Sequence, residues 1–243
     1  ECKEVCDPKF QYDSSNCTGD KVLTGNSCGG KYEKCIEPLQ YLYSDRTLSA
    51  EIIPGKSVIG IAVDPENRLA VAIDYIMTTG WGGYGIDIPT LENTPSSGAG
   101  IYVRGERDSY LIRDGKANTA KILAYGRSNG ISYPAAEAAY NYQPGSCSSS
   151  SWCGRGNWYL PSNWQVFPYF DNRATIHLML KAINKMPDDW WYTRNDFYTV
   201  TSNEINAKES GFIYINTGGM AHGGKNLTEP DNLQTLVLPY ITY

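Results

Sequence analysis

Residues suited to catalysis or to nucleic-acid binding are scarce in this chain of 243 residues, which contains only two histidines. Its 21 Lys and Arg are outnumbered by 26 Asp and Glu, the formal net charge is −5, and no basic cluster stands out. We therefore expect no nucleic-acid partner. No apolar run approaches the roughly 18 residues of a membrane-spanning helix, and the first residues are charged, so neither a membrane span nor a signal peptide is expected.

Phenylalanine is also scarce, with five residues against 19 Tyr and six Trp. Tyr and Trp rings carry a polar edge and suit half-exposed positions and binding surfaces. The aromatic composition therefore favours a protein that binds something through its surface.

Cysteine is unevenly distributed. Five of the seven cysteines lie in a segment at the start of the chain that contains almost no aliphatic residues. Disulfides best explain how such a segment is ordered, and they imply an oxidising, extracellular compartment. No C-x-x-C pair occurs, so zinc is disfavoured. The odd count leaves one cysteine unpaired, and the connectivity in the arm stays open. We divide the chain into a cysteine-rich arm, 1–36, and a body, 37–243; the disulfide candidates are Cys2, Cys6, Cys17, Cys28 and Cys35 in the arm and the close pair Cys147 and Cys153.

The body has the pattern of a mixed α+β fold with long loops. Apolar runs flanking a short turn predict a β-hairpin, and apolar residues at three- and four-residue spacing predict an amphipathic helix. The expected elements are a hairpin of 58–64 and 68–74, a loop over 78–100, helices over 135–142 and from Asp171 or Asn172 to Pro187, and strands over 197–202, 211–217 and 233–243.

The sequence offers no catalytic constellation, and we expect a protein that is not an enzyme and needs no cofactor. His177 lies on the amphipathic helix, where a structural role is favoured. His222 lies in a Gly-rich loop and is a candidate ligand contact. Calcium remains an alternative at the acidic loop segments 188–189 and 229–232, although no EF-hand spacing is present.

The segment Gly156–Ser162, GNWYLPS, resembles the W-x-L-P-S signature of the bacterial DUF1566 family, which is related to the Fibrobacter succinogenes major paralogous domain. Five further segments resemble parts of that family in order: 60–74, the DGKANTA segment 114–120, the small-residue helix 135–140, the TSNE segment 201–204 and the closing strand 234–243. The resemblance implies a C-type-lectin-like fold with two main helices and small twisted sheets. Its secreted and surface-anchored members resemble adhesins.

The signature also has a direct physical interpretation. Trp158 and Leu160 alternate as the core residues of a strand, and Ser162 with Gln165 forms a capping box for the helix that follows. Pro168 is expected to break that helix or keep it very short.

The segment after the amphipathic helix mixes large rings with Arg, Asn and Asp, a composition typical of binding hot spots. We therefore expect it to be a ligand-binding surface, although Trp191 or Phe197 could instead fill the core. The loop carrying Trp81 and Tyr84 is a second candidate. The expected ligand-contacting residues are Trp190, Trp191, Tyr192, Arg194, Asn195, Tyr198, Trp81, Tyr84 and His222.

The sequence thus favours a secreted or surface-displayed bacterial adhesion protein that binds a glycan or a surface protein without catalysis. The alternative is a structural subunit of a surface filament or pilus-like assembly that contacts itself. A formylglycine-generating type of oxidase comes third, because its reactive cysteine pair has no counterpart in the Ser-rich loop of Cys147 and Cys153.

Overall fold

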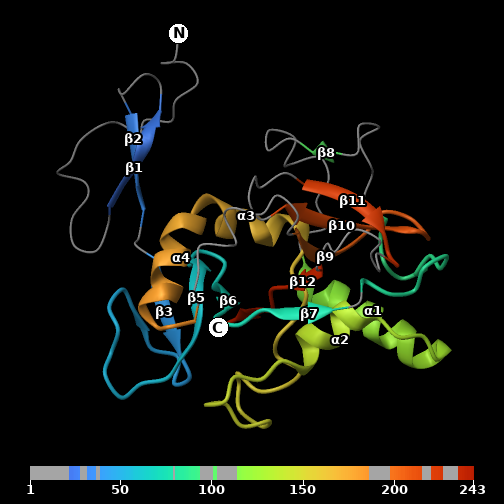
Figure 1. Ribbon diagram of the computed structural model, residues 1–243, viewed down its shortest axis with the longest axis horizontal. Helices are drawn as coiled ribbons and strands as arrows, with labels where there is room; N and C mark the ends of the chain where they lie inside the picture. Colours follow the sequence, from blue (N-terminus) through green and yellow to red (C-terminus); the bar gives the residue numbers. More distant parts are fainter. Residues whose placement is uncertain are drawn as a thin grey trace.

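The computed structural model has an α+β fold, with helices packed on antiparallel-rich sheets (Figure 1). Four helices and thirteen strands lie within the part of the chain that it describes. That part comprises residues 22–27, 32–36, 39–78, 80–93, 101–102, 114–185, 198–214, 220–226 and 235–243.

A five-stranded antiparallel sheet contains the predicted hairpin, which is confirmed. Its order is β13-β6-β5-β3-β4, and its hairpin strands have side chains buried on both faces, which explains their continuous apolar runs. Arg68 takes a left-handed conformation (φ 53°) in the turn. The strands are β3 (Gln40–Tyr43), β4 (Leu48–Ser49), β5 (Val58–Asp64), β6 (Leu69–Ala72) and β13 (Tyr240–Thr242).

The second large sheet has six strands in the order β7-β12-β9-β10-β11-β8. All its pairs are antiparallel except β12 with β9. Its strands are β7 (Ile76–Thr78), β8 (Ile101–Tyr102), β9 (Tyr198–Glu204), β10 (Glu209–Tyr214), β11 (Met220–Gly224) and β12 (Thr235–Val237). A separate antiparallel pair consists of β1 (Val22–Ser27) and β2 (Tyr32–Ile36).

The carboxyl-terminal segment connects the two large sheets. We expected one strand over 233–243, whereas β12 ends at Val237 and β13 begins at Tyr240. Pro239 lies in the gap and has no backbone N–H to offer a strand partner. Its carbonyl oxygen instead accepts a hydrogen bond of 2.9 Å from the backbone N–H of Ala72.

Two helices, α1 (Gly115–Asn129) and α2 (Pro134–Asn141), contact strands of the six-stranded sheet, whereas α3 (Asn163–Asp171) contacts strands of both large sheets (Figure 1). The predicted helix over 135–142 is confirmed as α2, with Pro134 as its first residue. The longest helix, α1, has no counterpart among our predicted elements.

The predicted amphipathic helix is confirmed as α4 (Arg173–Ala182), with Ile176, Met179 and Leu180 buried. It ends earlier than expected because Asn184 takes a left-handed conformation (φ 56°) before Pro187 is reached. Asn172 precedes the helix, but its side chain makes no capping bond.

The expected effect of Pro168 is wrong, although the capping box at Ser162 and Gln165 is confirmed. The helix α3 continues past Pro168 to Asp171. Phe167 and Phe170, on either side of the proline, are 1% and 3% exposed. Burial of these rings offsets the lost backbone hydrogen bond, so tertiary packing holds the helix together.

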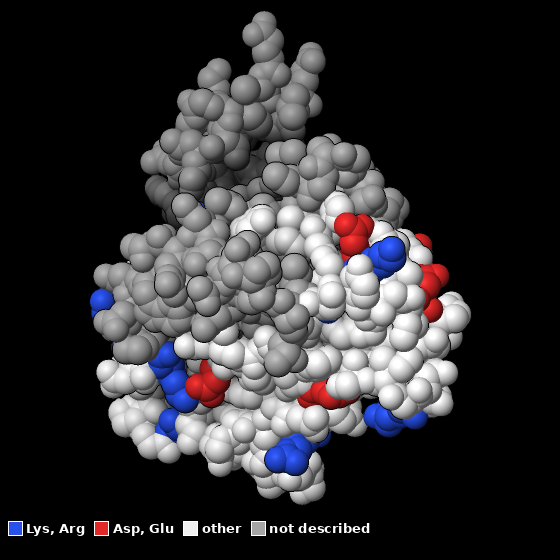
Figure 2. Space-filling view, turned by 45° about the vertical axis from the view of Figure 1, so that its right-hand side comes forward, with Lys and Arg blue, Asp and Glu red and all other residues white. Residues whose placement is uncertain are grey.

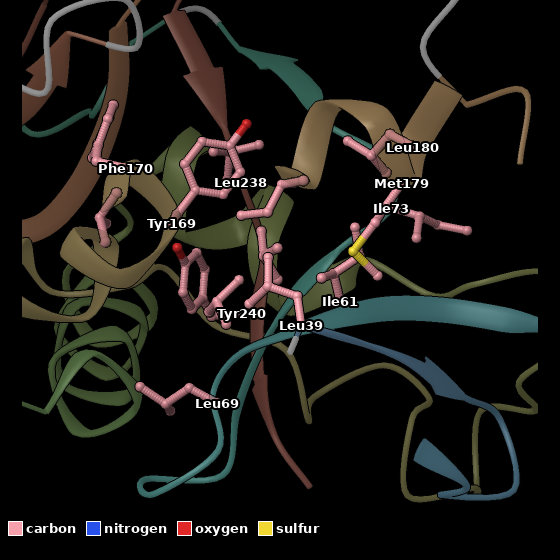
Figure 3. Packing of buried hydrophobic residues seen from close by; sticks show 14 of the residues in the cluster. Leu39, Ile61, Leu69, Ile73, Tyr169, Phe170, Met179, Leu180, Leu238 and Tyr240 are labelled. Atoms are coloured by element: carbon pink, nitrogen blue, oxygen red, sulfur yellow. The ribbon is translucent and has the colours of Figure 1, made fainter. Parts of the chain in front are cut away.

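Much of the tyrosine surplus lies in the core instead of on half-exposed surface. Figure 3 shows Tyr169 and Tyr240 packed among Leu238, Leu39 and other aliphatic side chains of the largest buried cluster. The hydroxyl of Tyr41 donates a 3.1 Å hydrogen bond to the carbonyl oxygen of Met179, whereas the buried hydroxyls of Tyr133 and Tyr240 have no hydrogen-bond partner among the described residues. The rings therefore supply apolar burial, and only some of their hydroxyl groups gain a hydrogen-bond partner.

The predicted disulfide between Cys147 and Cys153 is confirmed. Both cysteines are buried against Trp158, whose indole N–H donates a 2.8 Å hydrogen bond to the carbonyl oxygen of Cys153. Cys35 lies in β2, and the other four cysteines of the arm fall outside the described residues, so its pairing stays a prediction. No helix in the described ranges combines the length and apolarity needed to cross a membrane.

Candidate functional site

Three segments that carry the family resemblance meet in one buried polar junction. The hydroxyl of Thr119 donates to the carbonyl oxygen of Gly115 (2.7 Å) and accepts from the backbone N–H of Leu160 (3.0 Å). The side-chain oxygen of Gln165 accepts from the N–H groups of Gly115 (3.1 Å) and Ser162 (3.0 Å). The backbone N–H of Ser202 on β9 donates to the carbonyl oxygen of Pro161 (2.7 Å), which brings the third segment into the junction. These polar groups satisfy one another inside the protein, so the junction positions strand β9 rather than presenting a surface to a ligand.

Strand β9 ends at Glu204, whose carboxylate meets the ammonium group of Lys225, the residue after β11. Both side chains are 0% exposed, and Lys225 Nζ donates a hydrogen bond to Glu204 Oε1. The pair also holds the loop 80–91: Nζ donates to the carbonyl oxygen of Ile86 (2.6 Å), and Glu204 Oε2 accepts from the backbone N–H of Ile88 (3.1 Å). Two backbone groups of the loop therefore contact one fully buried ion pair, and the pair joins three segments of the chain.

Aromatic rings surround this pair. Lys225 Nζ lies 4.8 Å from the ring centroid of Trp81, and the rings of Trp81 and Tyr133 form a T-shaped pair with 5.5 Å between centroids. The backbone N–H groups of Trp81 and Gly82 donate to the carbonyl oxygen of Lys225 (3.1 and 3.0 Å). The rings keep water away and add a cation–π contact to the ammonium group.

Burial shifts the ionisation of these groups toward their neutral forms. It raises the pKa of Glu204 and lowers the pKa of Lys225, and the mutual contact opposes both shifts. Burial, together with the nearby charge of Glu204, raises the pKa of Tyr133 to about 12. The site therefore brings an acid and an amine into contact in surroundings that disfavour the charged form of each.

His222 lies on β11, where its side chain approaches that of Glu209 on the neighbouring strand β10. Its Nδ1 is 3.2 Å from Glu209 Oε1, and its side chain is 16% exposed. The imidazole is thus largely covered and engaged with a carboxylate, instead of lying free in a loop as the sequence suggested.

The other expected ligand contacts divide into three groups. Tyr84 is 50% exposed and stays on the surface, whereas Trp81 and Tyr198 are 2% and 1% exposed and therefore do not lie on the surface as a binding role requires. Tyr198 packs on Phe212 with 4.7 Å between ring centroids. The remaining residues, Trp190, Trp191, Tyr192, Arg194 and Asn195, lie outside the described residues.

A shallow groove of about 460 Å³ lies between α1 and α2. Its lining includes Arg127, Ser132, Glu137 and Tyr140, with Glu137 accepting a 3.1 Å hydrogen bond from the hydroxyl of Ser132. On the described part of the face in Figure 2, charges of both signs are scattered among uncharged side chains, without a large basic patch.

Metal ligands do not gather in the described part of the chain, where no three His, Cys, Asp or Glu side chains are placed to share an ion. The acidic segments considered for calcium, 188–189 and 229–232, lie outside that part.

No family model and no curated protein matches this chain. One solved structure with a similar fold is a fimbrial protein from Bacteroides ovatus ATCC 8483. The TM-score is 0.54, the sequences are 15% identical, and the match covers 84% of this chain but 48% of the fimbrial protein. The chain thus spans about half the length of that protein and shares its fold.

Proposed function

We propose that the chain is a structural subunit of a bacterial surface filament. The observation that carries this proposal is the fold shared with a fimbrial protein over 84% of the chain. The buried disulfide between Cys147 and Cys153 supports an oxidising, extracellular setting. In this role the chain is not an enzyme, and its main partner is a second copy of itself.

An edge strand offers a place for subunit contact. Strand β7 lies at one end of the six-stranded sheet, and β12 is its only strand partner among the described residues. Met77 on this strand is 40% exposed and the preceding Tyr75 is 37% exposed. An edge with apolar side chains and unpaired backbone groups favours addition of a strand from another chain.

Polymerisation of charge-altered variants tests this proposal. Met77→Lys places a charge on the edge strand and is expected to lower the fraction of polymer at least several-fold in sedimentation and electron microscopy. Leu178→Lys is the matched control, because Leu178 is 66% exposed and lies on α4, outside the six-stranded sheet. Equal assembly of both variants would remove β7 from the interface. A wild-type chain that never polymerises, even in native extracts, would refute the filament role.

A glycan- or protein-binding role is the second candidate, and the exposed ring of Tyr84 favours it. In this proposal the C-type-lectin-like resemblance applies to the body, and the rings of Trp190, Trp191 and Tyr192 supply most of the contact. A glycan and surface-protein array tests it with Trp190→Ala and Tyr84→Ala. Loss of binding without loss of stability supports an adhesin, and unchanged binding by both variants counts against it.

A further inference from the structure

The buried contact between Glu204 and Lys225 has the composition of an amide bond plus one water molecule. Both side chains are 0% exposed, and the amine contacts the carboxyl group directly. Two charges buried together in a dry site carry a desolvation cost that their mutual attraction does not always offset. A neutral amide formed from the two side chains, with the same backbone neighbours, would avoid that desolvation cost.

We propose that Glu204 and Lys225 condense into an intramolecular amide bond that joins β9 to the turn after β11. The existing hydrogen bond carries one proton from the ammonium group to the carboxylate, giving a neutral amine and a carboxylic acid. The Nζ lone pair attacks Cδ of Glu204, the Cδ–Nζ bond forms, and the Cδ–Oε1 bond breaks. Oxygen Oε1 leaves as water with one proton from the acid and one from the amine, so the step needs no oxidant, reductant or metal.

Two backbone groups are placed to assist this step. The N–H of Ile88 already donates to Glu204 Oε2 at 3.1 Å and can stabilise the negative charge that develops on this oxygen in the tetrahedral intermediate. The carbonyl oxygen of Ile86, 2.6 Å from Nζ, holds the amine in place by accepting one of its protons. The surrounding burial favours the neutral acid and the neutral amine, which are the reacting forms.

The same groups suit the product. The amide N–H can still donate to the carbonyl oxygen of Ile86, and the amide oxygen can still accept from the N–H of Ile88. Each buried polar atom of the product therefore keeps a partner, while both charges disappear. The bond would close a covalent loop between residues 204 and 225 around β10 and β11, and it does not depend on the chain being a filament subunit.

The test is a mass measurement on the full chain after reduction and denaturation. The wild-type chain is expected to be lighter than its sequence by one water molecule, whereas Lys225→Met is expected to have its full sequence mass. The matched control is Lys185→Met, which removes a lysine from an exposed ion pair with Asp74 and should keep the deficit. A wild-type chain at its full sequence mass overturns the proposal.

A tryptic map of the wild-type chain locates the bond without any variant. Trypsin does not cleave after an amidated lysine, so the peptide holding Lys225 should remain uncut there and be joined to the peptide holding Glu204. The map is needed because an amino-terminal glutamate such as Glu1 can cyclise with the same loss of mass. A separate peptide that ends at Lys225, recovered in full yield, shows a simple ion pair and refutes the amide.

Discussion

The indole N–H of Trp81 donates a 2.8 Å hydrogen bond to the carbonyl oxygen of Thr201, a residue 120 positions further along the chain. The bond ties the loop 80–91 to the middle of β9. Trp81 also packs on Tyr133 and contacts Lys225. The loop that sequence composition suggested as a ligand-binding surface is therefore anchored by the very ring that we expected it to display.

Replacing Trp81 should lower the stability of the fold and should not act by removing a ligand contact. Trp81→Ala removes a ring that is 2% exposed and is expected to lower the free energy of unfolding by about 3–5 kcal/mol. Tyr84→Ala, in the same loop but 50% exposed, should change it by less than about 0.5 kcal/mol. Urea denaturation of both variants checks this expectation, and a small effect of Trp81→Ala would contradict the burial described here.

Alanine variants of Gly82 and Gly85 distinguish how backbone conformation and close packing each affect stability. Both have positive φ, 99° and 84°, so alanine is strained at either position. A Cβ at Gly82 would lie 2.6 Å from the carbonyl oxygen of Ser132, whereas nothing lies within 4 Å at Gly85. Gly82→Ala should therefore lose about 1–3 kcal/mol more than Gly85→Ala in the same denaturation experiment. Equal losses would mean that Gly82 is not closely packed against the segment 132–134 at the start of α2.

The disulfide should stabilise the body modestly because the loop it closes is short. The cysteines are separated by six positions, and replacing both Cys147 and Cys153 by alanine is expected to cost about 2 kcal/mol on the loop-closure account. Ser150→Ala, in the exposed part of the same loop, serves as the control and should have little effect. Thermal melts should show no further loss when the double variant is reduced; a loss there would mean that the arm cysteines stabilise the fold.

Tyr133 should make the protein sensitive to alkali. A tyrosine in an unfolded chain has a pKa near 10, whereas the folded state raises the pKa of Tyr133 to about 12. The unfolded state therefore binds fewer protons above pH 10, and stability falls as the pH rises from about 10 to about 12. In Tyr133→Phe this fall should be less steep.

At pH 7 the same variant should be as stable as the wild type, or more stable by up to about 1 kcal/mol. The hydroxyl of Tyr133 is buried and has no hydrogen-bond partner among the described residues, so removing it exposes no orphaned group. Tyr159→Phe is the comparison, because it breaks a 3.0 Å hydrogen bond with Thr242 and should cost about 1 kcal/mol. An unchanged alkaline slope in Tyr133→Phe would contradict this account.

Local patterns predicted local structure well. The hairpin of β5 and β6, the helix after Pro134, the capping box at Ser162 and the buried face of α4 each depend on residues a few positions apart. Helix α1 escaped prediction because the face it buries includes Asn118 and Thr119, which bond to Ser202 and Leu160 instead of forming an apolar stripe. Its polar face is understandable only once the partner segments are in place.

Contacts between residues far apart in the sequence determine the candidate site, and local sequence patterns do not predict them. Nothing near Glu204 or Lys225 in the sequence indicates that the two meet, because their contact depends on the register of β9, β10 and β11. Likewise, whether Trp81 faces solvent or core is settled by Thr201 and Tyr133, which lie far from it in sequence. Aromatic composition alone therefore could not distinguish a binding surface from a core.

Immunogold electron microscopy of the cells that produce this chain tests its role as a filament subunit most directly. An antibody against the folded body should label surface filaments at regular intervals along their whole length. Label confined to filament tips, or absent from filaments while the native chain is monomeric in extracts, would contradict the account.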